Sequence, residues 1–342
     1  MKKVKRSVKI IIAVALVIVL LLASGVIFYL SKLNLIKFSN GKFTWSGSPD
    51  MSDSETLDEE SRMDEAIADL EEKDAVDATG EIYKDKRFLN ILLIGTDERA
   101  ESFSKNARGD SCMIMSIGKK DGSLKLASLE RGMGVPILDG KYKGQYDWLT
   151  HTFRYGGADL MMREVRECFK VDVERYIRVN FATFKKGIDS LGGIDITLTA
   201  AEAGYINNTG RSCTAGVNHL DGETALIYAR CRYIDSDWHR IERQRNVIQA
   251  VVTKTKDLSV GELNTLLNNV LPLVQTNLTR LEITELLLSA PKYRGVQIKQ
   301  MTVPISGSYG GMRGLGGRSL FSVDFDTNAK ALREFIYGVT TE

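Results

Sequence analysis

The feature that most constrains what this chain can fold into is an uncharged stretch of 21 residues, Ile10 to Leu30. As an α-helix it would be about 31 Å long, which matches a bilayer hydrocarbon core of about 30 Å. Basic residues dominate positions 1–9, and a basic flank predicts the cytoplasmic side. We therefore expect a cytoplasmic tail over 1–9, one transmembrane helix over 10–30, and all later residues outside the cell.

A cleaved signal peptide is the rival interpretation, because Ala23, Ser24 and Gly25 are small residues of the kind found at cleavage sites. The apolar run continues beyond them to Leu30 and is longer than the usual core of a signal peptide. The pattern therefore favours an uncleaved, single-pass anchor in the cell membrane.

The next segment, 31–86, is predicted to be an acidic extracellular linker or stalk. Ser46 to Pro49 contains residues that break regular structure, and Asp58 to Asp77 is rich in acids. The apolar residues at 63, 67 and 70 have helical spacing, so a short helix, a self-associating stalk and a disordered tether all remain open. The net charge of the whole chain is only +2, and no nucleic-acid partner follows from it.

The folded domain is expected over 87–342, and its first part has the pattern of three strands. Phe88 to Ile94 is a nearly continuous apolar run, which predicts a buried strand. Ser111 to Ile117 and Leu124 to Leu129 are the second and third strands. The turn residues between them, 119–122, predict a hairpin.

Three charged side chains flank these strands. Asp97 follows the first strand, Asp110 precedes the second, and Arg131 follows the third. Because a hairpin returns the third strand to the end where the second begins, Asp110 and Arg131 should be neighbours, with Asp97 beside them. Two carboxylates next to arginines suit Mg²⁺ on a diphosphate, since magnesium takes few protein carboxylates and adds water and phosphate oxygens. The alternative is that both aspartates only form turns.

Beyond these strands, helical and extended patterns alternate. The segments with helical apolar spacing are 157–170, 181–191, 263–274 and 283–288, and the extended ones are 171–179 and 194–198. Such alternation predicts an α/β fold, a layered α-β-α domain around a central mixed sheet. The apolar stripes are core positions in the first interpretation, and some of them line a groove for a lipid chain in the second.

Arginine is concentrated between Tyr228 and Arg245. The five arginines of this stretch are Arg230, Arg232, Arg240, Arg243 and Arg245. The guanidinium group stays charged and binds phosphate oxygens in a bidentate way. We therefore expect a site for a multiply charged anion, first of all a diphosphate. The alternative is a solvated, salt-bridged helix surface.

The same stretch contains the expected start of a helix. Asp235 or Asp237 is predicted to cap it. On that helix Arg240, Arg243 and Gln244 are spaced to share one face. A shared face predicts that the three side chains serve one site.

Four motifs in this chain resemble those of the LytR-CpsA-Psr family, in the same order. They are Ile94-Gly95-Thr96-Asp97-Glu98-Arg99, Arg108-Gly109-Asp110-Ser111, Ser128-Leu129-Glu130-Arg131, and the arginine stretch with its R-x-R, D-x-D and R-x-x-R-Q pattern. The similarity covers roughly 88–256. The predicted N-terminal anchor also fits the topology of the family.

The resemblance implies a membrane-anchored phosphotransferase of Gram-positive cell envelopes. Such proteins move a glycopolymer, typically a teichoic acid or a capsule, from a polyprenyl diphosphate carrier to peptidoglycan. On this resemblance Asp97 and Asp110 hold Mg²⁺. The catalytic residues would be Asp97, Arg131 and Arg240, with Asp97 the candidate general base by position only. The residues implied to surround the diphosphate are Arg99, Arg108, Arg131, Arg230, Arg232, Arg240, Arg243 and Gln244.

The chain departs from the family pattern at the third motif, where the family often has Pro before and Asp after the arginine. Here Glu130 and Gly132 stand at those positions, and a lysine expected near 148–150 is missing. Two other functions remain open. One is a hydrolase of the same lipid diphosphates, with water as the nucleophile, and the other is a non-enzymatic envelope-binding module or transcription attenuator.

The chain has four cysteines, Cys112, Cys168, Cys213 and Cys231. In the expected topology they lie outside the cell, where disulfides form. A disulfide between Cys213 and Cys231 is one expectation, and buried free thiols are the other. The cysteines and histidines show no spacing typical of a zinc site.

Overall fold

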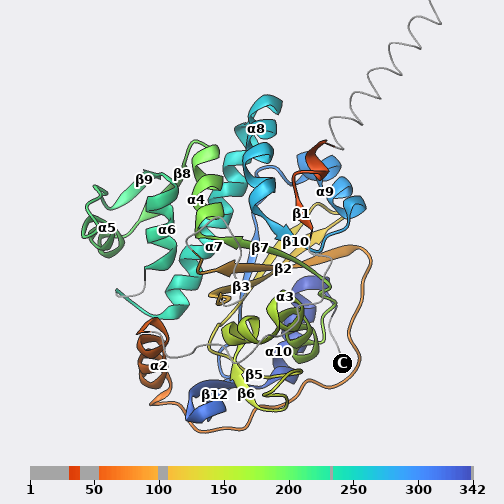
Figure 1. The fold of residues 1–342 in the computed structure, drawn as a ribbon, viewed down its shortest axis with the longest axis vertical. Helices are drawn as coiled ribbons and strands as arrows, with labels where there is room; N and C mark the ends of the chain where they lie inside the picture. Colours follow the sequence, from red (N-terminus) through yellow and green to blue (C-terminus); the bar gives the residue numbers. More distant parts are fainter. Residues whose placement is uncertain (1–30, 39–53, 99–106, 232–233, 340–342) are drawn as a thin grey trace, which may run out of the picture.

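The computed structural model describes residues 31–38, 54–98, 107–231 and 234–339 of the chain. Within these ranges seven strands form a mixed sheet through the middle of the molecule (Figure 1). In spatial order they are β1 (Lys37–Phe38), β10 (Gln275–Thr276), β7 (Arg175–Asn180), β2 (Phe88–Thr96), β3 (Ser111–Gly118), β4 (Leu124–Leu129) and β11 (Lys299–Val303). β2, β3 and β4 form an antiparallel meander, and β7 and β11 lie parallel to β2 and β4. The predicted central mixed sheet is confirmed.

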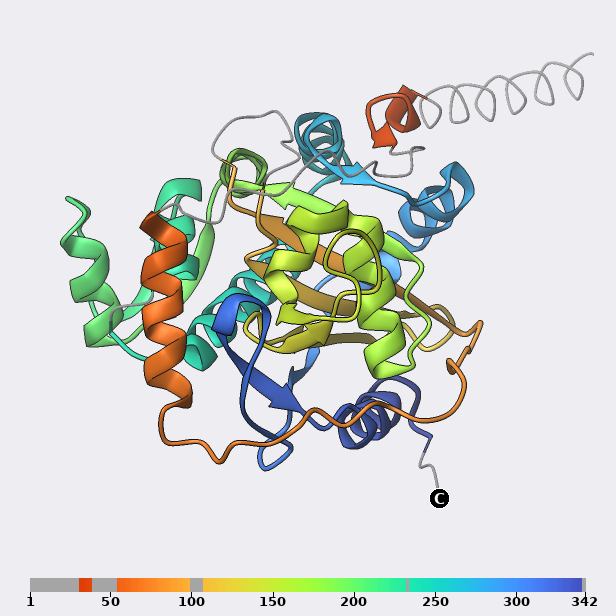
Figure 2. The same cartoon turned by 60° about the horizontal axis from the view of Figure 1, so that its bottom comes forward.

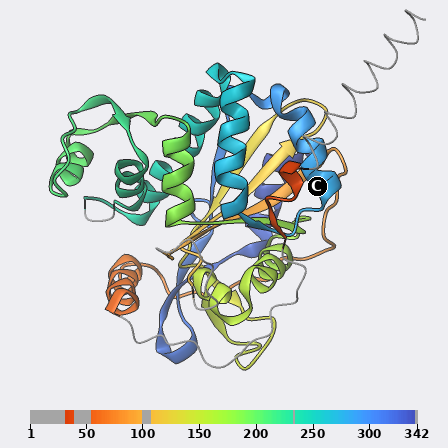
Figure 3. The same cartoon turned by 45° about the horizontal axis from the view of Figure 1, so that its top comes forward.

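Helices cover both faces of this sheet, which gives the predicted α-β-α layering (Figure 3). Successive side chains of a strand point to opposite faces. Leu92 and Ile94 therefore pack with α3 (Leu149–Phe169) and α10 (Phe325–Tyr337). Met113 and Leu126 on the other face pack with α7 (Asp237–Lys254), and Ile91 packs with α9 (Arg280–Tyr293). The long apolar run of β2 follows from burial on both sides.

A helical lobe extends from one end of the sheet. Its elements are α4 (Phe181–Ser190), β8 (Ile194–Leu198), α5 (Ala200–Asn207), β9 (Gly216–Leu220), α6 (Gly222–Arg230) and α8 (Val260–Val270). Ile194, Ile206 and Tyr228 form its core together with Val247 of α7. The lobe thus shares α7 with the sheet, so α7 connects the two cores.

Several boundaries differ from the sequence-based expectation. The helix expected over 157–170 begins earlier, at Leu149, and its two parts meet at Gly156 and Gly157, where Gly157 has a φ of 65°. Only glycine adopts such a φ readily, so a glycine pair expected to start the helix instead joins two helical pieces. The strand expected over 171–179 starts at Arg175.

Helix α2 (Ser54–Ile67) is packed on the domain, and the expectation of a free linker or stalk up to residue 86 is wrong for this part (Figure 2). Met63 and Ile67 are buried against Trp148 and Leu320. The helical spacing in the acidic segment therefore marked a core-facing stripe. Backbone bonds from Val76 to Val323 and from Tyr83 to Lys170 tie down the residues that follow (N–O 3.0 and 2.9 Å).

The remaining elements complete the base on which α2 rests. They are β5 (Gly134–Pro136), β6 (Tyr146–Trp148), β12 (Tyr309–Arg313) and β13 (Ser319–Val323), with 3-10 turns at Thr255–Asp257, Leu271–Leu273 and Leu315–Gly317. Arg318 donates from Nε to Glu60 of α2 (2.7 Å) and from Nη1 to the buried Asp147 (3.0 Å). This ion-pair chain fixes α2 to the β6–α3 junction.

Two expectations about the termini and cysteines remain. The predicted tail and transmembrane helix, 1–30, lie outside the described residues, and within the described part of the chain no helix is long and apolar enough to span a bilayer. All four cysteines, which lie in the described ranges, are free thiols. The expected disulfide between Cys213 and Cys231 is therefore not formed. Cys231 is buried, whereas Cys213 is half-exposed.

A buried carboxyl on α3 makes the stability of the fold depend on pH. Glu164 is fully buried, its Oε1 accepts a hydrogen bond from the Leu138 backbone N–H (3.3 Å), and burial raises its pKa to about 8. The native state therefore binds an extra proton between the unfolded pKa of about 4.3 and the folded value. Stability falls as pH rises through that window.

Replacing Glu164 with glutamine should remove this dependence. We expect Glu164→Gln to match the wild type near pH 4 and to be more stable by roughly 2–4 kcal/mol near pH 9. Urea unfolding of both proteins at the two pH values measures the difference. A difference that is the same at both pH values would contradict the titration of a buried Glu164.

Candidate active site

Asp97 and Asp110 lie together at one end of the sheet and share one arginine. The antiparallel pairing of Gly95 with Ser111 brings the end of β2 to the start of β3. Arg108, whose side chain is 2% exposed, donates from its backbone N and its Nε to the two oxygens of Asp97 (3.0 Å each). The same Nε lies 3.8 Å from Oδ1 of Asp110. The structure therefore places Arg108 against the two carboxylates.

Arg131 is joined to this pair through Thr150. The Thr150 hydroxyl donates to Oδ1 of Asp110 (3.5 Å), and the Thr150 backbone N–H donates to the carbonyl of Arg131 (3.2 Å). The hairpin of β3 and β4 thus brings the three predicted charged residues together as expected. Thr150 was not predicted, because only the tertiary contact of α3 with the β3–β4 hairpin gives it a role.

The electrostatics of the two aspartates favour a bound cation. Burial, and then the charge of Asp110, raise the pKa of Asp97, while Arg108 acts in the opposite direction. Two carboxylates and one guanidinium leave negative charge in a partly buried place. Among the residues that the structure describes, no group of three or more His, Cys, Asp or Glu side chains gathers for a metal. Two carboxylates fit Mg²⁺, which completes its shell with water and phosphate oxygens.

Arg131 and Arg240 meet on a second acid, Asp237. Oδ2 of Asp237 accepts from Nε of Arg131 (2.9 Å) and from Nη2 of Arg240 (3.3 Å). Both arginines are buried, at 4% and 2% exposure. Beside them Glu130 is fully buried, and burial followed by the charge of Asp237 raises its pKa to about 7. This pair of arginines offers a concentrated positive charge next to the aspartate pair.

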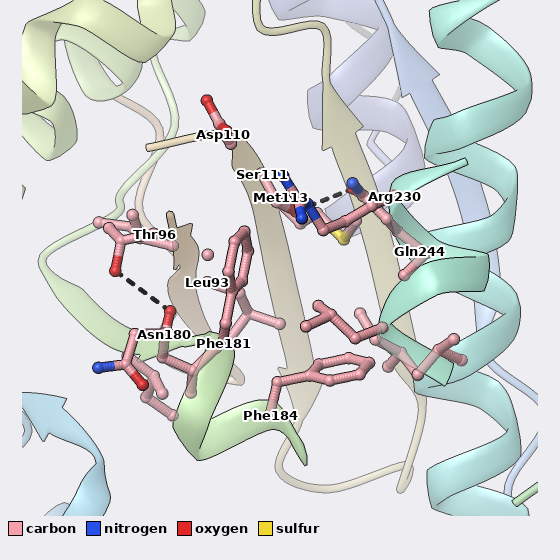
Figure 4. Close-up of a pocket in the computed structure, with 18 of the residues that line it drawn as sticks. Leu93, Thr96, Asp110, Ser111, Met113, Asn180, Phe181, Phe184, Arg230 and Gln244 are labelled. Atoms are coloured by element: carbon pink, nitrogen blue, oxygen red, sulfur yellow. Dashed lines mark hydrogen bonds between the residues drawn. The ribbon is translucent and has the colours of Figure 1, made fainter. Parts of the chain in front are cut away.

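An apolar cavity of about 240 Å³ begins beside these charged groups. Figure 4 shows its polar end, with Asp110, Ser111, Arg230 and Gln244, and its apolar end, with Phe184. The Ser111 hydroxyl donates to Oε1 of Gln244 (3.0 Å). The guanidinium carbon of Arg230 lies 4.5 Å from the ring centre of Phe181. The cavity is therefore amphipathic, with an anion-binding end and a hydrophobic end.

The walls of this cavity come from the sheet and the helical lobe. The apolar side chains that line it are Leu93, Ile94, Met113, Ile177, Val179, Phe181, Phe184, Leu226, Val247 and Ile248. Asn180 ends β7 and caps α4, because its Oδ1 accepts from the Thr183 backbone N–H (2.9 Å). This cap starts α4 at Phe181 and places both phenylalanines in the cavity. The second interpretation of the apolar stripes, a groove for a lipid chain, fits this arrangement.

Arg243 does not join the site, so its predicted role at the diphosphate is corrected. Its guanidinium donates to both oxygens of Asp235 (2.7 and 2.5 Å), to Glu202 (3.3 Å) and to the carbonyl of Cys231 (2.8 Å). It lines neither the apolar cavity nor the space around Arg131. The arginine thus holds the segment that connects α6 to α7.

The predicted helix cap is also corrected. Ser236 occupies the N-cap position of α7 and makes no side-chain capping bond. Asp235 instead binds Arg243, and Asp237 binds the two site arginines. The residue pattern typical of a helix start reflects charge pairing here. The predicted diphosphate ligands Arg99 and Arg232 lie outside the described residues.

Arg178 was missed by the sequence analysis. It ends β7, is 5% exposed and forms an ion pair with Glu98, next to Asp97. Its guanidinium carbon also lies 4.6 Å from the ring centre of Phe153. On an alternating strand such an arginine has the pattern of a solvent-facing residue. Only the layer formed by α3 shows that this side chain is covered and supports the site from behind.

These features define a class: a three-layer α/β domain with an anion site of arginines and carboxylates at the mouth of an apolar cavity. The LytR_cpsA_psr family model matches residues 52–333. The chain therefore belongs to this family, as the resemblance predicted.

Similar curated proteins carry one name. The polyisoprenyl-teichoic acid–peptidoglycan teichoic acid transferase TagU of Bacillus mycoides (strain KBAB4) is 33% identical over 195 residues, 56% of this chain and 61% of that protein. TagU of Enterococcus faecalis (strain ATCC 700802 / V583) is 33% identical over 199 residues, 57% of this chain and 63% of that protein. The matches thus span less than two thirds of these relatives.

Solved structures show the same fold. TagT bound to LIIa-WTA has a TM-score of 0.59 and 25% identity, with 78% of this chain and 97% of that chain covered. A LytR-CPS2A-psr family protein, YwtF (TagT), with bound octaprenyl pyrophosphate lipid has a TM-score of 0.56 and 22% identity, with 78% and 98% covered. At 22% identity the second likeness concerns the fold alone.

Proposed function

We propose that this protein is a membrane-anchored, Mg²⁺-dependent phosphotransferase that moves a glycopolymer from a polyprenyl diphosphate carrier to peptidoglycan. The observation that carries the proposal is the amphipathic cavity, in which Arg230 and Arg240 stand at the entrance of a hydrophobic space. A lipid diphosphate has the same two parts, a charged head and an apolar chain. The names of the TagU relatives and the ligand of the TagT structure support this assignment.

The reaction needs positioning and charge neutralisation more than covalent chemistry from the protein. A hydroxyl oxygen of the acceptor sugar attacks the phosphorus that carries the glycan and forms a new P–O bond. The P–O bond to the lipid phosphate breaks, and its electron pair leaves with polyprenyl phosphate. The hydroxyl proton passes to a carboxylate, and Asp97 is our candidate by position.

The residues of this chain divide the remaining tasks. Arg131, Arg240 and Arg230 would bind the diphosphate oxygens, and Arg108 orients the two aspartates. Asp97 and Asp110 would hold Mg²⁺, which when bound supplies further neutralisation of phosphate charge. The proposed membrane anchor, 10–30, would keep the cavity outside the cell and near the lipid carrier. The cargo polymer, whether teichoic acid or capsule, is left to experiment.

Transfer itself is the test of this proposal. The full-length chain in detergent is incubated with a lipid diphosphate donor that carries a labelled glycan and with purified peptidoglycan, and label in the insoluble peptidoglycan is measured. Transfer to peptidoglycan is expected. Release of free phosphorylated glycan without transfer would favour the hydrolase, and tight donor binding without turnover would favour a binding module or attenuator. Mass spectrometry of lipid that co-purifies with the chain identifies the carrier.

Metal removal gives a separate prediction. We expect EDTA to reduce transfer to background and added Mg²⁺ to restore it, because the carboxylate pair needs a cation to accept a diphosphate. The rate of transfer is measured across a Mg²⁺ titration, with sodium sulfate at equal ionic strength as the control for screening. Full activity in EDTA would show that Asp97 and Asp110 hold no required metal.

A further inference from the structure

A second cavity, of about 580 Å³, borders the site on the side of Arg131. We call it the α2 groove: one wall is α2, the other is the start of α7 with Asp237 and Trp238, and Arg131 lies at its end. Asp237 binds both Arg131 and Arg240, and Arg240 lines the apolar cavity. The two cavities therefore meet at one pair of arginines. Nothing in the proposed diphosphate site occupies the α2 groove.

The lining of the groove combines an aromatic ring with polar groups. Trp238 is half-buried, and its ring centre lies 5.6 Å from that of Tyr309 and 6.1 Å from that of Phe321. These neighbours hold the indole in place. Across from it, Arg62 and Glu65 of α2 supply charged side chains. A sugar ring has an apolar face and hydrogen-bonding edges, so an aromatic surface beside polar groups suits it better than a lipid chain.

The geometry of phosphoryl transfer assigns the groove to one of the two substrates. The attacking and leaving oxygens lie roughly in line on opposite sides of the phosphorus. The leaving group is polyprenyl phosphate, whose chain fits the apolar cavity on the Arg240 side. The attacking hydroxyl must then approach from the opposite side, where Arg131 borders the α2 groove.

The wall formed by α2 is a fixed part of the domain. Arg318 binds Glu60 (2.7 Å), and Arg313 binds Asp64 (3.1 Å). A Cβ placed on Gly132 would lie 2.1 Å from Cε of Met63. The glycine that replaces the family's usual aspartate therefore leaves the space in which Met63 seats α2. This departure from the family pattern is what allows the groove to have its second wall.

We propose that the α2 groove binds the acceptor, a sugar of a peptidoglycan glycan strand, with the ring of Trp238 against the sugar face. The inference rests on the proposed function, because it names the site of the second substrate in that reaction. It makes Trp238 a residue for acceptor binding and leaves the donor to the apolar cavity.

The kinetic test compares Trp238→Ala, Trp238→Phe and wild type, all full-length in detergent. We expect Trp238→Ala to raise KM for soluble, uncrosslinked glycan strands about tenfold, with KM for the lipid diphosphate donor unchanged and Trp238→Phe intermediate. The matched control is Arg163→Ala, an exposed arginine on the outer surface that pairs only with Asp139 in the printed contacts. An unchanged acceptor KM, or a raised donor KM instead, would overturn the assignment.

A binding arm separates this inference from the proposed function. Binding of tetra-N-acetylchitotetraose, a soluble β-1,4-linked sugar probe, is measured by calorimetry without any donor. Weaker binding by Trp238→Ala, with the melting temperature unchanged, supports the groove even if the wild type transfers no glycan. Equal binding by wild type and Trp238→Ala, or no binding by the wild type, would refute it whatever the transfer assay shows.

Discussion

Asp97→Asn is expected to lower the rate of glycan transfer by at least about 10²-fold, the loss typical when one preorganised electrostatic group is removed from an active site. The substitution keeps the size of the side chain and an oxygen that can accept from the Arg108 backbone N–H. It removes the negative charge that would bind a cation and that faces Nε of Arg108 at 3.0 Å.

The folded state should survive this change better than the activity does. The buried guanidinium of Arg108 keeps Asp110 as a neighbour at 3.8 Å, so it is not left without a counter-charge. We therefore expect a native circular dichroism spectrum and a melting temperature close to that of the wild type. Transfer of labelled glycan is measured over a range of Mg²⁺ concentrations, because a weakened metal site shows as a higher Mg²⁺ requirement.

Asp139→Asn is the matched control for Asp97→Asn. Asp139 is an exposed carboxylate, 68% accessible, and pairs with Arg163 on the outer surface. An exposed pair of this kind contributes little to stability, and the control should transfer glycan at the wild-type rate. A fall in Asp97→Asn no larger than that of Asp139→Asn would remove Asp97 from both its proposed roles, as a metal ligand and as the general base.

The parts of the site that sequence predicts well depend on local patterns. β2, β3 and β4 follow from apolar runs and from one hairpin turn, and each begins at the predicted residue. Because that turn also sets which ends of the strands are adjacent, the meeting of Asp110 and Arg131 could be expected. The family motifs then pointed to the same residues.

The parts that sequence misses depend on contacts between distant segments. The acidic stretch before residue 87 has the composition of a tether, and only Trp148, Leu320 and Phe321, far along the chain, make its apolar stripe a buried face. Arg178 likewise depends on the cover that α3 provides. Composition describes a segment alone, whereas burial depends on what packs against it.

The arginine stretch shows the same limit at the scale of one helical turn. Helical spacing puts Arg240 and Arg243 on neighbouring positions, which predicted one shared role. Arg240 turns to Asp237 and the apolar cavity, and Arg243 turns to Asp235 and Glu202. Residues of one motif thus divide into a group that binds the substrate and a group that holds the fold.

Arg243→Ala is therefore expected to have the largest effect on stability among the arginine variants. Removing one partner of a buried ion pair typically costs about 3–5 kcal/mol, because the other charges stay buried without compensation. Here Asp235, Glu202 and the Cys231 carbonyl all lose their donor. For a domain of this size such a loss lowers the melting temperature by roughly 10 °C.

The pH dependence of that loss identifies its cause. Arg243 holds the pKa of Asp235 below its usual value, mainly by their hydrogen bond. A depressed folded pKa gives stability above the unfolded value that is lost as pH falls through the folded one. The gap between Arg243→Ala and the wild type should therefore narrow below about pH 4. Thermal unfolding at pH 7 and pH 3 measures both gaps.

Arg163→Ala is the matched control, since it also removes a helical arginine from an aspartate pair, but one that is 53% exposed. Exposed pairs contribute about 0–1 kcal/mol, so the control should unfold almost as the wild type does. Arg243→Ala with the stability of Arg163→Ala but without transfer activity would place Arg243 at the diphosphate after all. A variant that is less stable at 37 °C, yet active when assayed cold, would instead confirm the division between Arg240 and Arg243.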